Sequence, residues 1–422
     1  MHRITIKALQ ALAVGLIAAI ATGAHAGPTN YWMRLKAQNK DERSKIANLG
    51  LSIEGVIEDS VFVIGGEKDL AIAKKSGLLD TSFEITHENT RDFPPYDSQF
   101  HNYERLTQEI QKIASQYPSI VKLSTIGKSL EGRDQWLLTL SADGKDGARP
   151  AVFFMGGHHA REHVSIETPL QLAQYLAEHF TAGDKRIVDL LSNRTVYIVP
   201  CVNPDGAEYD ISSGDYQLWR KNRRHNTDGS EGVDLNRNYG HHWGEGGASD
   251  NGDSEVYHGP SAFSEPETLN IKTFFESHSN ISIDLTFHTF SELILFPWGY
   301  TNDRISDQKA FMVHKTMAET MAKWNGYTPE QSSTLYIASG DTTDWAFGAH
   351  GIISFTFELD PKMSPDMNWQ PDKGFYPGQS FIRPVFEKNL EPCLYLIGFS
   401  DNPYRVLQSQ SERYGLSAGI LK

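Results

Sequence analysis

The feature that most constrains this chain is a short apolar run, Ala151–Met155, which two glycines stop at once and a helical pattern follows. The helical pattern, residues 165–180, places Leu172, Leu176 and Phe180 on one side of a helix. An apolar strand followed by an amphipathic helix is typical of α/β proteins. The chain from residue 100 onward continues this alternation. We therefore expect a large α/β domain in which helices flank a central mixed sheet.

The N-terminus predicts a secretory signal over residues 1–26. Arg3 and Lys7 precede an apolar stretch, and the segment ends in the small-residue pattern Ala24-His25-Ala26. The alternative, a membrane anchor, is disfavoured because Gln10 interrupts a run that is already short for a bilayer. We expect a secreted protein, in the medium or the periplasm, with no membrane association after signal removal.

The rest of the chain divides into three parts. Residues 27–93 alternate short strand and helix patterns and predict a small α/β unit. A polar stretch with Pro94-Pro95 ends this unit and is expected to be a linker. Residues 94–404 form the large domain, and residues 405–422 are a C-terminal tail.

Composition narrows the chemistry. The chain has 39 basic and 53 acidic residues and a net charge of −14, which argues against nucleic acid and anionic membranes as partners. Its only cysteines, Cys201 and Cys393, lie in apolar surroundings, where buried free thiols and one disulfide are equally compatible with the sequence. Two cysteines do not make a zinc site, so any zinc must be held by histidines and carboxylates.

A histidine cluster, "MGGHHAREHV", follows the apolar strand. Ligands bind at the carboxyl ends of strands in open α/β sheets. His159 and Glu162 are three residues apart, a metal-ligand spacing, but His158 lies four residues before Glu162 and His163 is adjacent to it. Spacing alone leaves the ligating histidine open. A turn whose histidines only bond the backbone is the structural alternative.

Two later strands supply further groups. In "NISIDLTFHTF" apolar and polar residues alternate, and His288 ends the strand on the side away from the apolar face. In "GIISFTFELD" the same pattern delivers Glu358. A zinc ion with two histidines, one glutamate and an open position is a hydrolase site. A separate carboxylate is then needed as the base.

Six segments, in order, resemble the signature blocks of the zinc carboxypeptidases of the carboxypeptidase A/B type, including secreted bacterial members such as carboxypeptidase T. They are "GHHARE", "LWRKNRR", "GVDLNRNYG", "FHTFSELILFPWGY", "LYIASGDTTDW" and "FTFELD". The resemblance runs from about Tyr96 to Tyr404. It implies a carboxypeptidase-like fold and hydrolysis of the C-terminal peptide bond of peptides and proteins.

The resemblance implies roles for individual residues. One Zn²⁺ is held by His159, Glu162 and His288, which leaves His158 and His163 without a metal role. Glu358 matches the general base that takes a proton from the zinc-activated water and later gives it to the leaving amine. Arg220 matches the arginine that supports the developing oxyanion.

Other positions match substrate-binding residues. Asn236 and Arg237 match the pair that holds the terminal carboxylate, in keeping with the bidentate geometry of a guanidinium. Asp234 matches the group that orients the His159 ring. Arg161 resembles a subsite arginine, and Tyr336 matches a mobile tyrosine that closes over substrate. Taken singly, each of these residues is as compatible with a capping or solvated role.

The sequence departs from the pattern at two places. Phe290 stands where the pancreatic enzymes have a tyrosine, so a phenol hydrogen bond is lost while ring packing is kept. In the segment matching the specificity pocket, Thr343 replaces the apolar residue of the A type and the aspartate of the B type, and Asp341 lies nearby. We expect broad specificity for apolar and basic C-terminal residues.

By the same resemblance, residues 27–93 correspond to an inhibitory propeptide, removed by an activating protease with Arg91 as a candidate cleavage point. A permanent accessory domain is the alternative. The clustered carboxylates of Asp250, Asp253 and Glu255 make Ca²⁺ binding an alternative, but their spacing does not match an EF-hand, and we expect a solvated loop.

Ser264 and Glu267 form a capping-box pattern and are expected to begin a helix.

Two rival functions remain. One is a zinc amidohydrolase of the same fold that acts on cell-wall peptides. The candidate carboxylate clamp at Asn236 and Arg237, with Tyr336, favours substrates with a free terminal carboxylate and counts against it. The other is a non-catalytic peptide-binding relative. The complete set of metal ligands, base and Arg220 argues against a retired site.

Overall fold

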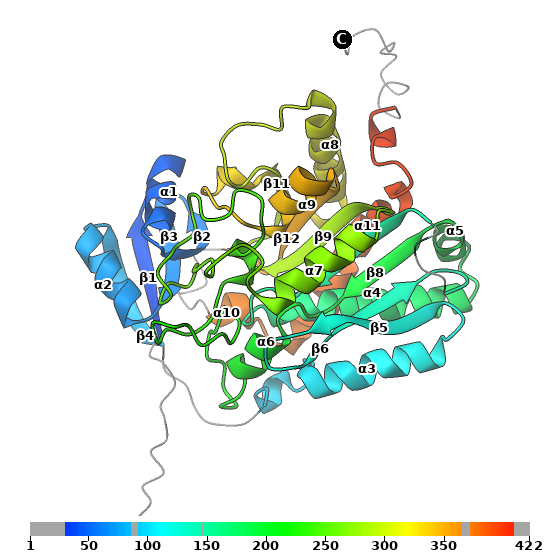
Figure 1. The fold of residues 1–422 in the computed structure, drawn as a ribbon, viewed down its shortest axis with the longest axis horizontal. Coiled ribbons are helices and arrows are strands. Elements are labelled where there is room, and N and C mark those ends of the chain that lie inside the picture. Colours follow the sequence, from blue (N-terminus) through cyan, green and yellow to red (C-terminus); the bar gives the residue numbers. More distant parts are fainter. Residues whose placement is uncertain (1–29, 86–91, 145–146, 148, 364–371, 409–422) are drawn as a thin grey trace, which may run out of the picture.

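A computed structural model describes residues 30–85, 92–144, 147, 149–363 and 372–408 (Figure 1). The predicted signal peptide and the candidate cleavage point Arg91 lie outside these residues. Among the helices of the described part, none has the length and apolarity needed to cross a membrane.

The predicted small α/β unit is present as a four-stranded antiparallel sheet with two helices. Its strands lie in the order β2-β3-β1-β4, and helices α1 and α2 pack against them. The bounds are β1 Asn30–Lys36, α1 Lys40–Asn48, β2 Ser52–Ile57, β3 Ser60–Gly65, α2 Glu67–Ser76 and β4 Leu79–Ile85. Figure 1 shows this unit, in blue, against one end of the large domain.

Both faces of this small sheet are apolar. One packs against the unit's own helices and the other against the large domain. Met33 on β1 and Val63 on β3 are buried in one cluster with residues of α1 and α2. Their neighbours Trp32, Phe62 and Ile64 face the opposite way and are buried against the large domain. The period-2 alternation of the strands therefore gives the unit one face for its own core and one for docking.

The large domain is built on the predicted mixed sheet, which has eight strands in the order β11-β10-β12-β9-β7-β8-β6-β5. The central run β12, β9, β7 and β8 is parallel, whereas β10 against β12, β8 against β6 and β6 against β5 are antiparallel. The bounds are β5 Val121–Lys128, β6 Asp134–Leu140, β7 Ala151–Gly156, β8 Thr195–Val199, β9 Ile281–Thr289, β10 Leu293–Phe296, β11 Thr328–Gln331 and β12 Ile353–Leu359.

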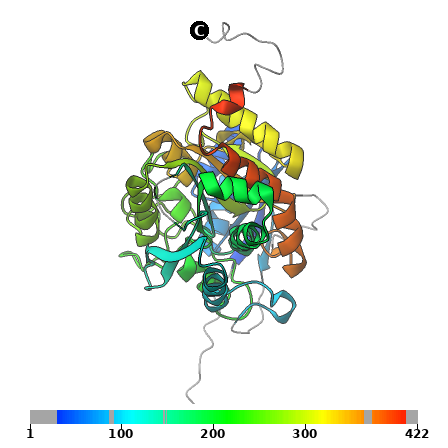
Figure 2. The same cartoon turned by 90° about the vertical axis from the view of Figure 1, so that its right-hand side faces the viewer.

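Helices cover both faces of this sheet (Figures 1 and 2). One face packs against α3 Tyr103–Gln116, α4 His163–Thr181, α5 Lys185–Asn193, α8 Gln308–Asn325 and α11 Ile382–Phe399. The other face packs against α7 Pro266–Ser277 and α9 Thr342–His350. The short helices α6 Pro204–Asp210 and α10 Asp372–Phe375 lie in the connecting segments.

Three parallel strands end at the same edge of the sheet. The segment after β7 carries the histidine cluster, and β9 and β12 are paired so that Glu358 lies opposite His288. In the same register Thr286 lies opposite Thr356, two residues earlier on each strand. Parallel register thus brings groups from distant parts of the sequence to one place, as ligand sites of α/β sheets require.

The alternation in β9 was expected to separate a buried face from a polar one. The apolar side is buried, but Asp284, Thr286 and His288 on the other side are buried as well. The reason is that α9 covers that face of the sheet. The segment after Pro94 also packs more closely than a linker would, since Asp97 is buried and accepts a hydrogen bond from Tyr216.

The capping-box prediction is wrong. Helix α7 has Glu265 as its N-cap with no side-chain capping bond, and Pro266 occupies its first turn. Ser264 instead donates a hydrogen bond to Glu265, and the buried Glu267 accepts one from the backbone N–H of Leu130. The two cysteines are free and buried, so the thiol alternative holds.

Candidate active site

Three side chains converge where β7 and β9 end. His159 Nδ1 lies 2.7 Å from Glu162 Oε1 and 3.1 Å from His288 Nδ1, and His288 Nδ1 lies 2.9 Å from Glu162 Oε2. All three residues are buried. Burial favours a neutral Glu162, but the two histidines hold the pKa of its carboxyl below the ordinary range.

The arrangement fits a metal ion. The ligand atoms of the three residues lie within 4.8 Å of one another, and within the described part of the chain no other group of three such residues converges in this way. In a tetrahedral zinc site with bonds of about 2.0 Å the ligand atoms are about 3.3 Å apart. His159 Nδ1 and His288 Nδ1 face each other at 3.1 Å beside the Glu162 carboxylate, so in the tautomers with free lone pairs both rings point at one position. A cation at that position would bind both nitrogens and the carboxylate.

A buried aspartate supports the site from behind. Asp234 Oδ1 lies 3.2 Å from His159 Nε2, the ring nitrogen that faces away from the metal position. Its Oδ2 accepts a hydrogen bond of 3.0 Å from Arg220 Nε. Burial works to raise the pKa of Asp234, yet Arg220 and His159 hold it well below the ordinary value. The ionised carboxylate therefore joins the imidazole to the arginine.

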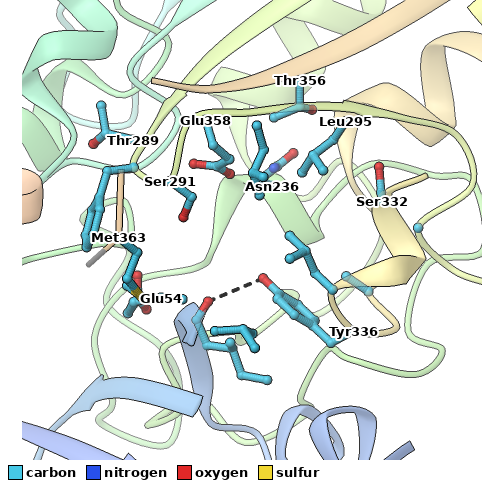
Figure 3. Close-up of a pocket in the computed structure, with 18 of the residues that line it drawn as sticks. Glu54, Asn236, Thr289, Ser291, Leu295, Ser332, Tyr336, Thr356, Glu358 and Met363 are labelled. Atoms are coloured by element: carbon cyan, nitrogen blue, oxygen red, sulfur yellow. Dashed lines mark hydrogen bonds between the residues drawn. The ribbon is translucent and has the colours of Figure 1, made fainter. Parts of the chain in front are cut away.

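A cavity of about 350 Å³ lies over these groups and is lined by both domains. Its lining includes Ile53, Glu54, Gly55 and Val56 of the small unit and His159, Glu162, Arg220, Asn236, Arg237, Tyr336, Asp341 and Glu358 of the large domain. In the close-up, Glu358 and Asn236 lie on one side of the cavity, and Glu54 and Tyr336 on the other (Figure 3). Burial, followed by the nearby Glu162, raises the pKa of Glu358 well above its ordinary value.

Asn236 and Arg237 are held by the backbone and by helix α9. The amide oxygen of Asn236 accepts hydrogen bonds from the backbone N–H and the hydroxyl of Thr342, both at 3.0 Å. Arg237 donates to the carbonyls of Asn236 and Gly247. Both residues are buried and line the cavity, so a guanidinium and an amide face the same space.

Asp341 lines the cavity, whereas Thr343 is not among the residues that line it. Asp341 caps α9 by accepting from the backbone N–H of Asp344 at 2.8 Å. The hydroxyl of Thr343 bonds that of Thr356 at 2.7 Å. Burial raises the pKa of Asp341, and burial together with Asp341 raises that of Asp344 well above its ordinary value. One negative charge shared by two carboxyls is consistent with these shifts.

The small unit covers Arg161 and Tyr336. Arg161 is fully buried and bonds Glu54 Oε1 at 2.7 Å, Glu255 at 3.1 Å and the carbonyl of Leu218 at 2.9 Å. The Tyr336 hydroxyl points to the carbonyl of Ile53 at 3.4 Å (Figure 3). Both residues therefore contact the small unit where substrate contact was predicted.

Further contacts fasten the small unit to the large domain. Polar ones join Asn48 to the backbone of Gly247, Ser44 to Ile337, Arg43 to Thr334, Asn30 to Gln217, Ser254 to Gly50 and Lys68 to Asp253. An apolar cluster joins Trp32, Phe62 and Ile64 to Leu218, Phe290 and Phe375. Phe290, the predicted departure, packs here by its ring.

Two of the three candidate calcium ligands have other partners. Asp253 pairs with Lys68, and Glu255 pairs with Arg161. Their charges are thus partnered by cations from the small unit and from the histidine segment. The Ca²⁺ site stays a prediction without a contact in its support.

Sequence reasoning missed two parts of this site. It gave no role to Glu54, because a single glutamate in a strand carries no signal of a partner 107 positions away. It also left His158 aside, although that residue contacts Tyr239, Thr342 and Thr286 beneath the metal position. The doubled histidine was the one available hint.

The fold and the site together define a single-metal hydrolase on an α/β sheet. The profile of the zinc carboxypeptidase family matches residues 106–392. A zinc carboxypeptidase of Saccharothrix mutabilis subsp. capreolus is 32% identical over 435 residues, covering 95% of this chain and 98% of the relative. A carboxypeptidase B of Astacus astacus is 36% identical over 268 residues, covering 62% of this chain and 86% of the relative.

A solved structure gives the same fold. The carboxypeptidase A of Helicoverpa armigera superposes with a TM-score of 0.70 at 24% identity, covering 89% of this chain and 98% of the other. The chain belongs to the zinc carboxypeptidase family. It is therefore a zinc-dependent peptide hydrolase.

Proposed function

We propose that this chain is an exported carboxypeptidase that removes single residues from the C-terminus of peptides and that its own N-terminal unit holds inactive. One observation carries the proposal. Two of the three converging metal-binding residues, His159 and Glu162, line the same cavity as Glu358, Asn236 and Arg237, and residues of the N-terminal unit line it as well. Export rests on the predicted signal at residues 1–26.

The metal would be held by His159, Glu162 and His288. When bound there, a zinc ion supplies Lewis acidity toward a carbonyl oxygen and lowers the pKa of a water molecule. Glu358 is the general base and later the acid, because it is the carboxyl that lines the cavity beside His288 in the strand register without belonging to the converging ligands. Its raised pKa suits a group that must both take and return a proton.

Arg220 supports the charge that develops on the scissile carbonyl oxygen. Its guanidinium lines the cavity, and Asp234 fixes its orientation through the Nε bond of 3.0 Å. A cation held in place before the reaction costs no reorganisation when charge appears. The same Asp234 carboxylate faces His159, so the oxyanion cation and one metal ligand share a support.

Arg237 and Asn236 bind the terminal carboxylate of the substrate. A guanidinium provides a bidentate fork, and the amide of Asn236 turns its NH₂ group toward the cavity because Thr342 holds its oxygen. This clamp demands a free C-terminus and so favours a carboxypeptidase over an amidase that acts on cell-wall peptides. Tyr336, at the opposite side of the cavity, closes over bound substrate.

The side chain of the substrate's C-terminal residue binds near Asp341. Leu295 and Thr356 give this part of the cavity an apolar and a neutral wall, and Asp341 adds a carboxyl. We infer that apolar and basic C-terminal residues are both accepted. Comparable kcat/KM values for peptides ending in Phe and Arg support this, and a preference of about a hundredfold for either contradicts it.

The N-terminal unit is an inhibitory propeptide. Glu54 reaches into the cavity, bonds Arg161 and lies 3.9 Å from Arg220, so it occupies the cationic groups that a substrate needs. The unit also buries an apolar cluster shared with the large domain. Cleavage between this unit and residue 94 by an activating protease would be needed for substrates to enter.

The test is the release of free amino acids from peptides that differ only in the last residue. The chain is assayed intact and after limited proteolysis, with and without a chelator. Release confined to the last residue, sensitive to the chelator and increased by proteolysis, supports the carboxypeptidase activity, its metal dependence and the inhibitory role of the N-terminal unit. Release from peptides with an amidated C-terminus at the same rate would contradict the clamp. Full activity of the intact chain would contradict the propeptide.

A further inference from the structure

The amide of Asn236 is fixed by a chain of buried hydrogen bonds that starts on a residue without an assigned role. Thr342 donates to the amide oxygen with both its backbone N–H and its hydroxyl, each at 3.0 Å. The Thr342 hydroxyl in turn lies 3.1 Å from His158 Nε2. Asn236, Thr342 and His158 are all buried.

His158 is held on every side. Its Nδ1 lies 3.1 Å from the Thr286 hydroxyl, and its Nε2 lies 2.9 Å from the Tyr239 hydroxyl. Its ring stacks on that of His288, with centroids 5.4 Å apart and planes 17° from parallel. Tyr239 is itself tied to the start of α9, since its backbone N–H bonds the carbonyl of Gly340 at 2.9 Å.

The donors and acceptors in these contacts determine which way the amide of Asn236 points. The backbone N–H of Thr342 is always a donor, so the atom of Asn236 that faces it must be the oxygen. The NH₂ group then points the other way, toward the cavity that Asn236 lines, with His288 Nε2 as a distant neighbour at 3.5 Å. A hydroxyl that donates to Asn236 still has lone pairs free for His158 or Tyr239.

We infer that His158 and Thr342 are positioning residues that hold Asn236 with its NH₂ group facing the terminal carboxylate of the substrate. The inference rests on the proposed role of Asn236. Without the hydroxyl of Thr342, one of the two donors to the amide oxygen is lost and the side chain gains freedom to rotate. Carboxylate binding then weakens, while the metal ligands and Glu358 keep their places.

The experiment measures binding of one ligand with and without its charge. N-acetyl-phenylalanine and its primary amide are compared as competitive inhibitors of the zinc-loaded chain in its active form. The ratio of the two inhibition constants reports the carboxylate clamp. Variants are Thr342→Val, Thr342→Ser, His158→Phe, which keeps a ring on His288, and the double variant Thr342→Val with His158→Phe. Zinc content and melting temperature are measured for each.

Thr342→Val is expected to reduce the ratio and raise KM by about three- to tenfold, with kcat changed by less than about twofold. Thr342→Ser restores the wild-type values, since it keeps the hydroxyl. His158→Phe changes the ratio in the same direction, and the double variant is no worse than the more affected single variant because both act through Asn236. Thr168→Val is the matched control, because its buried hydroxyl bonds the Val164 carbonyl of its own helix and no other partner among the residues that the structure describes.

Asn236→Leu separates this inference from the proposed function. If Asn236→Leu abolishes the preference for the carboxylate but Thr342→Val and His158→Phe leave the ratio at the wild-type value, the positioning role is overturned and the clamp stands. If Asn236→Leu itself leaves the ratio unchanged, the clamp fails and the inference falls with it. Should Thr342→Val not fold, His158→Phe carries the same test.

Discussion

Glu54 and Arg161 form a buried ion pair of 2.7 Å across the boundary between the N-terminal unit and the large domain. Arg161 lies in the same short segment as His159 and Glu162, so the pair ties the N-terminal unit to the metal-binding segment itself. Ser52, two residues earlier on β2, donates a hydrogen bond to the same glutamate. The carboxylate is thus pre-oriented by its own unit before it meets the arginine.

Glu54→Gln should raise the activity of the intact chain. The substitution keeps the shape of the side chain but removes its charge, and a hydrogen bond to a charged group contributes about 1.5–3 kcal/mol. A loss of this size increases the population with the N-terminal unit displaced by about tenfold or more. The measurement is peptidase activity of unprocessed protein, with its intact mass checked before and after the assay.

Glu58→Gln is the control for this variant, since Glu58 is exposed in the turn between β2 and β3 of the same unit. Its activity should equal that of the wild type. Equal residual activity of the Glu54→Gln and wild-type chains would show that the ion pair does not contribute to closing the cavity.

Most of the confirmed predictions came from the periodicity of apolar residues within single strands and helices. Strand and helix periodicity predicted a central mixed sheet and a small α/β unit before it, although not the number or order of their strands. Counting the alternation also placed Glu358 and His288 at strand ends. Choosing His159 over His158 needed the family resemblance, because both lie within one turn of Glu162. In the structure His158 points beneath the site and His159 into it.

Contacts between distant segments could not be predicted. Nothing in the residues around Glu54 indicates that it pairs with Arg161, and the burial of Asp284 depends on helix α9, which packs on its side of β9. The failed capping box has the same origin. Glu267 bonds the distant backbone of Leu130, and Ser264 bonds its neighbour Glu265, so neither side chain makes the capping bond that the sequence pattern predicted.

Glu358→Gln should abolish peptide hydrolysis while leaving the metal in place. Glu358 lines the cavity but is not one of the three converging ligands. Removal of a general base costs about 10²–10⁴-fold in kcat. Activity and zinc content are measured on the same sample. Glu162→Gln is the comparison, because it removes a ligand and should lose zinc as well as activity. Loss of zinc from Glu358→Gln would mean that this carboxyl is a ligand instead.

The preference for basic over apolar C-terminal residues should increase with pH. Burial raises the pKa of Asp341, so this carboxyl stays protonated to a higher pH than an exposed aspartate and becomes charged as pH rises through that raised value. Arg237 and Asp344 are the charged neighbours that modulate it. The ratio of kcat/KM for peptides ending in Lys and in Leu, measured from about pH 5 to about pH 9, reports this charge.

Asp341→Asn should flatten that ratio while sparing the Leu peptide, since an asparagine still caps α9. Using a ratio cancels the effect of pH on the metal site, which both substrates share. A ratio that is already constant in the wild type would show that Asp341 does not interact with the substrate side chain.

Asp284→Asn should stabilise the protein at neutral and alkaline pH. Asp284 is fully buried on β9, with Oδ2 bonded to Ser354 and Oδ1 without a hydrogen-bond partner among the described residues. Burial raises the pKa of its carboxyl to about 8. The folded state therefore keeps a proton that the unfolded state releases near pH 4, and stability falls as pH rises between these two values, by up to about 1.4 kcal/mol per pH unit. An asparagine has no proton to lose and removes this slope.

Melting temperatures of the two proteins should agree near pH 4 and diverge in favour of the variant toward pH 8. Parallel curves over the whole range would mean that the Asp284 carboxyl is ionised in the folded protein.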